Sequence, residues 1–173
     1  MLKNSSFLDM LMWNIILVGI WHLVTFMSCQ KLPDTMFDSS KNRYTAKQWE
    51  HGGRWYRVNL KIQVWKDRVP QYIGKGGFSK RHFTNDTIEY LDQFIMETCR
   101  GEWMHLKNCL CVVITFIIDP LLVGMLFSLF ILIGNLPFAI IQRYNRFRLQ
   151  TLRKRRIHEL SGADEMGRNT VTA

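Results

Sequence analysis

Two side chains that could exchange a proton lie one helical turn apart in this sequence. Glu102 and His105 fall inside or at the edge of an apolar arc that Leu91, Ile95 and Leu106 form at helical spacing. A carboxylate and an imidazole drawn toward low dielectric must pair or shift their pKa values, and acid/base sites are made in this way. The pattern therefore indicates Glu102 and His105 as candidate catalytic residues.

Two other roles for this pair stay open. A structural hydrogen bond between Glu102 and His105 would also hold two helices together. The Glu-x-x-His spacing occurs in carboxylate-bridged metal sites, but those sites need several further inward-facing ligands, so we predict no metal. The four cysteines lack the paired spacing of a zinc site, and we expect them to be reduced thiols.

A basic, glycine-bearing segment at 73–82 could bind an anionic group. Its glycines would let backbone N–H groups approach a phosphate, and Lys80 and Arg81 would neutralise the charge. A flexible, solvated turn has the same composition. Phosphate binding by Lys80 and Arg81 is therefore one of two interpretations.

A second basic segment, Arg143-Tyr144-Asn145-Arg146, directly follows a long apolar run. Each basic residue near anionic headgroups contributes about 1 kcal/mol of membrane attachment, and this anchoring accounts for the arginines. Tyr144 and Asn145 add nothing to charge anchoring. Binding of a substrate or a donor phosphate by these four residues is the second interpretation.

The first element that must position these residues is the apolar run 10–28. It is about long enough to cross a hydrocarbon layer of roughly 30 Å. Because no small-residue cleavage pattern follows it, we predict a transmembrane helix within residues 1–28 rather than a cleaved signal peptide. Asn14 and His22 lie inside this run, where polar side chains need partners and indicate contact with other helices.

The second apolar run, 109–141, is longer than one crossing requires, and Asp119-Pro120 interrupts it. Proline disfavours helical geometry at the preceding residue and removes a hydrogen-bond donor, so we expect a break there. Either residues 108–142 form a membrane hairpin, or only the second half of the run spans.

The basic residues favour the hairpin. Cytoplasmic loops attract Lys and Arg, and both the central segment 29–107, with 14 Lys and Arg against 9 Asp and Glu, and the tail 143–173 are basic. Only the hairpin places both on the cytoplasmic face of a bacterial cell membrane, with the amino terminus outside. The net charge of +9 indicates no nucleic-acid partner, because the positive residues flank membrane segments.

The central segment carries one ambiguous pattern, at 56–64. Apolar and polar residues alternate there, which favours a short strand, but Trp55, Val58, Ile62 and Trp65 also fit a helical stripe. The predicted fold is a mainly α-helical integral membrane protein. It has one amino-terminal transmembrane helix, a basic membrane-surface segment with an amphipathic helix and this short strand, and a carboxy-terminal membrane hairpin.

Several short motifs from residue 32 to residue 156 recur in combination in one known family. They are Leu32-Pro33-Asp34 with Phe37, Glu50 and Gly52 before an aromatic pair, Trp65-Lys66, Lys80-Arg81-His82, Glu97-Thr98-x-Arg100-x-Glu102-x-x-His105, Asn135-x-Pro137, and Gln142-Arg143-Tyr144-Asn145-Arg146-x-Arg148. In this combination the chain resembles the glycosyl-4,4'-diaponeurosporenoate acyltransferase family, small membrane proteins of staphyloxanthin-type carotenoid synthesis. The most specific are the block from Glu97 to His105 and the block in which Asn135-x-Pro137 leads into residues 142–148.

The resemblance implies transfer of a fatty acyl group to a sugar hydroxyl of a membrane glycolipid, a glycosylated carotenoid acid or a similar lipid. His105 is then the candidate base, with Glu102 orienting it, because a positioned base is worth about 10²- to 10⁴-fold in rate and a neutral imidazole suits pH 7. Arg100, Lys80 or Arg81 would stabilise the developing oxyanion. No Gly-x-Ser-x-Gly elbow is present, which favours direct transfer over an acyl-enzyme.

The same resemblance implies the remaining site and partner assignments. Further residues expected to bind the substrate or the donor are Glu97, Trp65 and Lys66. No bound cofactor is expected, and acyl-CoA or another activated fatty acid would be the co-substrate. Membrane lipids, the glycolipid and other membrane biosynthetic enzymes are the expected partners. The alternative from another functional class is a non-catalytic, lipid-binding or assembly subunit of a membrane enzyme complex.

Overall fold

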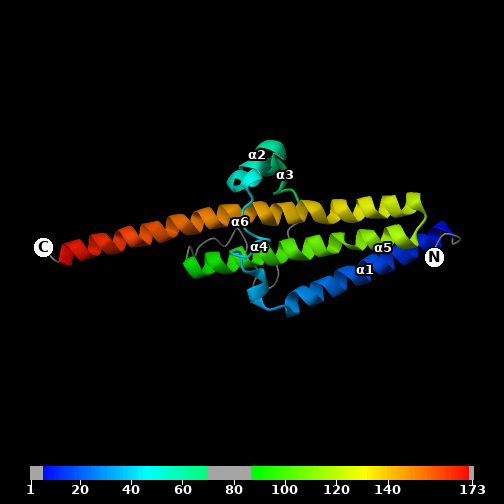
Figure 1. Ribbon diagram of the computed structural model, residues 1–173, viewed down its shortest axis with the longest axis horizontal. Coiled ribbons are helices and arrows are strands. Elements are labelled where there is room, and N and C mark those ends of the chain that lie inside the picture. Colours follow the sequence, from blue (N-terminus) through cyan, green and yellow to red (C-terminus); the bar gives the residue numbers. More distant parts are fainter. Residues whose placement is uncertain (1–5, 70–86, 172–173) are drawn as a thin grey trace. The chain divides into compact units, whose positions relative to one another are not determined.

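The computed structural model describes residues 6–69 and 87–171, with side chains up to residue 162, and every element in these residues is helical (Figure 1). The elements are α1 (Phe7–Lys31), η1 (Asp34–Phe37), η2 (Gln48–Gly53), α2 (Arg54–Asn59), α3 (Ile62–Trp65), α4 (Ile88–Cys109), α5 (Cys111–Ile118) and α6 (Leu121–Val171). The mainly helical fold predicted from the sequence is confirmed.

The short strand expected at 56–64 is wrong, because α2 and α3 occupy these residues. Lys61 adopts a left-handed backbone conformation, with φ 46°, between the two helices. Tyr56 and Ile62 are buried, whereas Val58 and Val64 are 62% and 63% exposed, so the alternate residues do not share one buried face. The residues are helical, but they form no continuous helical stripe either, because Lys61 separates α2 from α3 and Val58 is exposed.

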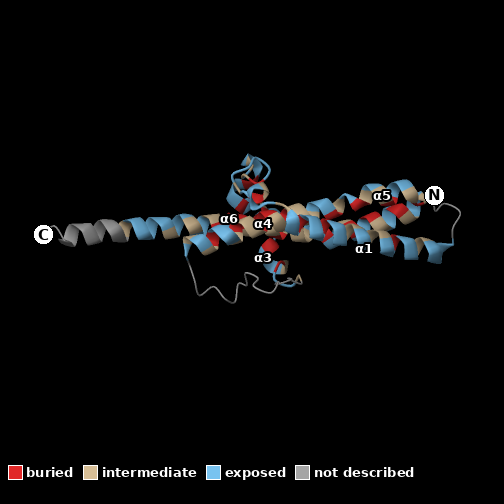
Figure 2. Ribbon diagram, turned by 90° about the horizontal axis from the view of Figure 1, so that it is seen from below, coloured by how far each residue is buried: buried red, intermediate tan, exposed pale blue. Residues whose placement is uncertain are grey.

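Three helical segments are long and apolar enough to cross a membrane: Phe7–Lys31, Ile88–Ile118 and Leu121–Gly162. Most of the α1 surface is exposed (Figure 2), although it is apolar all round. Such a surface fits lipid rather than water. The chain is therefore an integral membrane protein with an amino-terminal span and two spans farther along the chain.

The expected break at Asp119-Pro120 is present. Helix α5 ends at Ile118, Asp119 is extended with φ −94° and ψ 160°, and α6 begins at Leu121. An extended residue before proline avoids a clash with the proline ring. The helical segment that precedes the break runs from Ile88 to Ile118, so α4 leads into α5 and the apolar window lies within this longer segment.

The chain divides into two compact units. The first unit comprises residues 1–37 and 100–142, and the second comprises residues 38–99 and 143–173. Helices α4 and α6 contribute residues to both units.

In the first unit, α1, α5 and the first part of α6 run side by side (Figure 1). Buried polar contacts connect them: Asn14 Nδ2 donates to Asp119 Oδ1 at 3.1 Å, and the Thr115 and Ser128 hydroxyls lie 3.1 Å apart. Gly124 permits the turn to close tightly, since a Cβ there would lie 3.1 Å from the Thr115 carbonyl oxygen. Asn14 thus has the interhelical partner that its position in an apolar helix predicts.

In the second unit, the long helices α4 and α6 pack on each other, and the short helix α2 packs on α6. Leu91 and Ile95 of α4 form a buried cluster with Leu149 of α6. Tyr56 of α2 packs against Phe147 of α6, with ring centroids 6.2 Å apart. Gly53 has φ 90° and a Cβ there would lie 3.1 Å from the Phe147 ring, so this position favours glycine on both counts.

Candidate active site

In the first unit, two histidines and an asparagine from three different helices form one hydrogen-bonded chain. His105 Nδ1 of α4 lies 3.2 Å from Asn135 Oδ1 of α6, and Asn135 Nδ2 lies 3.2 Å from His22 Nε2 of α1. His22 Nδ1 lies 2.8 Å from the Val18 carbonyl oxygen. We call this chain, His22, Asn135 and His105, the histidine–asparagine network.

The direction of these bonds follows from their fixed ends. Asn135 Nδ2 also donates to the Ile131 carbonyl oxygen at 2.9 Å, which sets the orientation of the amide. His105 Nδ1 must therefore donate to Asn135 Oδ1, while His22 Nε2 accepts from Asn135 Nδ2 and His22 Nδ1 donates to Val18. A neutral His105 then carries its lone pair on Nε2.

This geometry fixes the tautomer of a neutral His105. In hydrolases an acceptor at Nδ1 holds the imidazole in the tautomer whose Nε2 takes the proton, and an asparagine fills that place in some cysteine proteases. The His105 ring is half-buried and stacks on Phe138 with ring centroids 5.0 Å apart. Packing on one face and a hydrogen bond at one edge together fix the ring.

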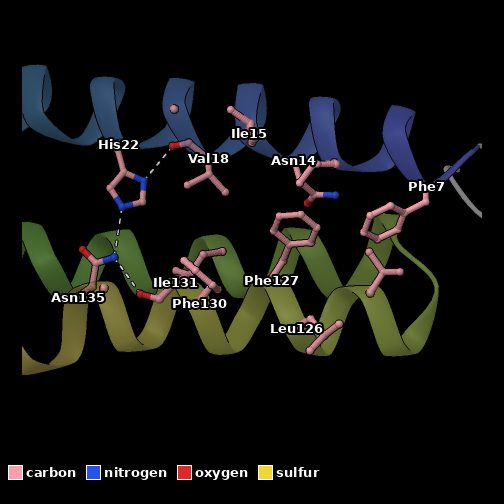
Figure 3. Close-up of a pocket in the computed structure, with 14 residues that line it drawn as sticks. Phe7, Asn14, Ile15, Val18, His22, Leu126, Phe127, Phe130, Ile131 and Asn135 are labelled. Carbon is pink, nitrogen blue, oxygen red and sulfur yellow. Dashed lines mark hydrogen bonds between the residues drawn. The ribbon is translucent and has the colours of Figure 1, made fainter.

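Two residues of the network, His22 and Asn135, line one end of an apolar groove between α1 and α6 (Figure 3). The groove has a volume of about 690 Å³, and the polar residues that line it are Asn14, His22 and Asn135. Its other lining residues are Phe7, Leu11, Ile15, Val18, Gly19, Val123, Leu126, Phe127, Phe130, Ile131 and Gly134. A hydrocarbon chain therefore matches the groove, and a polar group matches its His22–Asn135 end.

Glu102 and Arg100, two other predicted site residues of the first unit, lie close to His105 in sequence. Glu102 is buried, and its predicted role in orienting His105 stays a prediction; the described hydrogen bond of the His105 ring goes to Asn135. Arg100 forms an ion pair with Asp34, donates to the Cys29 carbonyl oxygen at 2.8 Å and lies over the Phe37 ring. These contacts fasten the end of α1 and the turn after it to α4.

The second unit contains a charged cluster around Glu50, which has no exposed surface. Arg143 Nε and Nη2 each donate to one Glu50 oxygen at 2.8 Å, and the Tyr56 hydroxyl and the Lys47 backbone N–H add bonds of 2.6 Å. Arg143 also donates to the Thr45 carbonyl oxygen. We call Glu50, Arg143 and Tyr56 the glutamate–arginine cluster.

Electrostatics in this cluster keep Glu50 ionised. Burial by itself raises the pKa of Glu50, but the hydrogen bonds from Arg143, Tyr56 and Lys47 outweigh it and lower the pKa below its ordinary value of 4.5. Burial and the adjacent carboxylate raise the pKa of the Tyr56 hydroxyl. The cluster is therefore a carboxylate, a guanidinium and a neutral phenol over the whole physiological pH range.

The other predicted binding residues of the second unit also have internal contacts. Arg146 is buried, with Nη1 3.2 Å from Cys99 Sγ, and the Tyr144 hydroxyl accepts a bond from Gln63. The Trp65 indole donates to the Leu60 carbonyl oxygen, and Lys66 pairs with Asp67. Glu97 accepts a bond from Gln93, and Asn145 is half-buried. Lys80 and Arg81 lie outside the described residues.

The structure thus separates the predicted site residues into two groups. His105, Glu102 and Arg100 belong to the first unit, while Arg143, Tyr144, Asn145, Arg146, Trp65, Lys66 and Glu97 belong to the second. In the part of the chain that the structure describes, no three His, Cys, Asp or Glu side chains are grouped so that they could hold a metal ion. The sequence did not indicate that His22 contacts the site. The one sign of it was that His22 is a polar residue inside an apolar helix.

Comparisons with known proteins identify the family. The sequence pattern of the glycosyl-4,4'-diaponeurosporenoate acyltransferase family matches residues 40–155. Relatives with this name from Staphylococcus aureus strains MRSA252 and bovine RF122 / ET3-1 are 29% identical over 151 residues, and one from strain Newman is 27% identical. Each alignment covers 86% of this chain and 88% of the relative. No solved structure matches the chain. The matched pattern spans most of α4 and α6, and the chain belongs to the glycosyl-4,4'-diaponeurosporenoate acyltransferase family.

Proposed function

We propose that this membrane protein transfers a fatty acyl group from an activated donor to a sugar hydroxyl of a membrane glycolipid, with His105 as general base. The observation that carries the proposal is the histidine–asparagine network, because it leaves the lone pair of neutral His105 on Nε2. The names of the relatives support a glycosylated carotenoid acid as the acceptor.

The chemistry needs only one proton carrier. The sugar hydroxyl attacks the acyl carbonyl carbon while its proton passes to His105 Nε2, and the Nδ1 proton stays hydrogen-bonded to Asn135. The tetrahedral intermediate then expels the leaving group, which takes the proton from Nε2. With a thioester donor such as acyl-CoA, the thioester bond breaks, the sugar ester forms and a thiol is released.

The depth of the network suits a reaction between lipids. His22 lies about 22 Å along α1 from Phe7, and Asn135 lies about 21 Å along α6 from Leu121, at 1.5 Å per residue. Arg143 follows Asn135 after about 12 Å more of helix. The reacting groups would thus meet inside the hydrocarbon region, near the boundary where the basic residues begin.

The orientation of the chain is also a proposal. An excess of Lys and Arg in residues 29–107 and 143–173 favours the cytoplasmic face of a bacterial cell membrane for both segments. A soluble donor such as acyl-CoA would then reach the His105 end from the cytoplasm. Lys80 and Arg81 remain the proposed contacts of its phosphates, because Arg143 and Arg146 bond within the second unit.

The test is acyl transfer in membranes that contain the protein, an acyl-CoA and a glycosylated carotenoid acid. His105→Ala should lower the transfer rate by about 10²- to 10⁴-fold at equal amounts of folded protein, because the base is lost. His158→Ala is the matched control, since His158 is an exposed histidine on α6 outside the first unit.

Two results would decide against the proposal. Full transfer by His105→Ala would remove this residue as the base. If the wild type transfers no acyl group to any glycolipid, and His105→Ala lowers only the amount of folded protein, the chain is the non-catalytic subunit, and the network only holds helices together.

A further inference from the structure

The groove between α1 and α6 has the form of a binding site for one linear hydrocarbon chain. It extends from Phe7 to His22 on α1, and this distance is about 22 Å at 1.5 Å per residue. The hydrocarbon core of a bilayer is roughly 30 Å thick, so each leaflet contributes about 15 Å. The groove is therefore longer than the hydrocarbon layer of one leaflet is thick. A stretched chain fits this length.

Two glycines keep the groove open next to its polar end. Gly19 lies one turn before His22, and Gly134 adjoins Asn135. A Cβ added at either position would meet no atom within 4 Å, so these glycines border empty space and not a neighbouring helix. The space beside the histidine–asparagine network is therefore wide enough for an additional ligand group.

The groove is also accessible from the side. Phe130 in its wall is 82% exposed, and Ile15 and Leu126 are 58% and 56% exposed. These side chains belong to segments that span the membrane, so their exposed surface faces lipid. A hydrocarbon chain can enter from the bilayer without passing through water.

From these features we infer that the groove holds the fatty acyl chain of the donor, with the acyl carbonyl beside His22 and Asn135, one hydrogen bond away from His105. The inference rests on the proposed acyl transfer and adds which substrate occupies the groove. In an acyl donor the reacting carbonyl carbon continues directly into hydrocarbon. The lining has the same order, a polar group followed directly by apolar residues. On α1 the lining residues between His22 and Asn14 are Gly19, Val18 and Ile15, and none of them is polar.

The hydrocarbon part of the glycolipid does not match this order. A whole sugar ring separates its reacting hydroxyl from its hydrocarbon, so the groove would need a polar region between the network and the apolar lining. The lining instead turns apolar immediately, at Gly19 on α1 and at Gly134 on α6. The acceptor should approach His105 Nε2 from outside the groove.

The experiment compares acyl-CoA donors of increasing chain length, from butyryl to stearoyl. Gly134→Phe places a ring in the groove beside the network, at a position where a Cβ would meet no atom within 4 Å, so it should lower transfer from palmitoyl-CoA by at least about tenfold relative to butyryl-CoA. Leu11→Trp, at the far end, should lower transfer only of the longest chains. Ile133→Phe is the matched control, because Ile133 is 63% exposed and does not line the groove.

A second arm changes the length of the acceptor hydrocarbon while the donor stays constant. If Gly134→Phe changes the preference for acceptor length and leaves the donor profile unchanged, the groove holds the glycolipid and the inference is wrong. An unchanged profile for both substrates would also overturn it, because an ordinary membrane lipid or a second copy of the chain would then fill the groove.

Photo-crosslinking separates this inference from the proposed function. A palmitoyl-CoA with a diazirine on its last carbon should label the α1 peptide that contains Phe7 and Leu11, and Gly134→Phe should abolish the labelling. Labelling without any transfer by the wild type would retain the donor groove and refute the acyltransferase reaction. Transfer without labelling there would refute the groove assignment alone.

Discussion

The histidine–asparagine network of the first unit and the glutamate–arginine cluster of the second unit are both buried polar groups, yet their bonding differs. Both Glu50 oxygens accept two bonds each, and the Nε, Nη1 and Nη2 atoms of Arg143 all donate. The network contains no Asp, Glu, Lys or Arg side chain, and the described bond of the His105 ring is made at Nδ1. We expect the cluster, whose opposite charges pair with each other, to stabilise the structure, whereas the network leaves the Nε2 edge of the His105 ring for the proposed reaction.

The largest expected effect on stability comes from breaking the cluster. Arg143→Ala leaves the Glu50 carboxylate buried without its cation, and removing one partner of a buried ion pair costs about 3 to 5 kcal/mol. Thermal unfolding in detergent should show this loss. Transfer per folded molecule should stay near the wild-type value, and a selective loss of transfer at unchanged stability would contradict the structural role.

Acidification should weaken the same cluster by a smaller amount. Because the pKa of Glu50 is lowered in the folded protein, its contribution is fully present above the ordinary value of 4.5 and is lost as the pH falls below it. Denaturant unfolding measured from about pH 7 down to about pH 3 should show this loss. In Glu50→Gln the dependence should be shallower, and an equally steep dependence would assign it to other carboxylates.

Replacing His22 tests the network in the way that Arg143→Ala tests the cluster. It removes a hydrogen-bond acceptor from the network and leaves no buried charge unpaired. His22→Phe leaves Asn135 less firmly oriented, so we expect kcat to fall by about tenfold with KM nearly unchanged, the pattern of an effect on the reacting groups. His22→Gln offers an amide oxygen as acceptor and should restore most of the rate. Equal rates for the Phe and Gln variants would show that His22 has no positioning role.

The smallest effect should come from an exposed ion pair of the second unit. Arg153 pairs with Asp92, but their side chains are 37% and 48% exposed, and such pairs contribute about 0 to 1 kcal/mol. Arg153→Ala should therefore change the unfolding midpoint slightly, and less in high salt. A loss as large as that of Arg143→Ala would mean that burial is not what distinguishes the two ion pairs.

The sequence predicts the local features of this fold well. An apolar run of sufficient length predicts α1, and proline predicts the break at Asp119-Pro120, since both depend on neighbouring residues. The strand at 56–64 was wrong because a period of two and a period of 3.6 overlap in a segment this short. Whether Val58 and Val64 become buried depends on packing that a short pattern does not contain.

The site was only partly predictable for a related reason. His105 has a local signal, because it lies at the edge of an apolar arc. Its described partner, Asn135, lies 30 residues away, and the next link, His22, lies 113 residues from Asn135. Arg143 follows an apolar run, and this local position predicted contacts with lipid headgroups or a phosphate. In the structure Arg143 forms an ion pair with Glu50, which lies 93 residues earlier in the sequence.

The pairing of Asn14 with Asp119 has a consequence for how the protein is made. The two residues are 105 positions apart, so at about 5 to 20 residues per second the ribosome needs roughly 5 to 20 s to synthesise the chain between them. During that interval Asn14 and His22 have left the ribosome while Asp119 and Asn135 do not yet exist. Until then the partners of the Asn14 and His22 side chains are the Met10 and Val18 carbonyl oxygens of α1 itself, and their bonds to other helices form once Asp119 and Asn135 have been made.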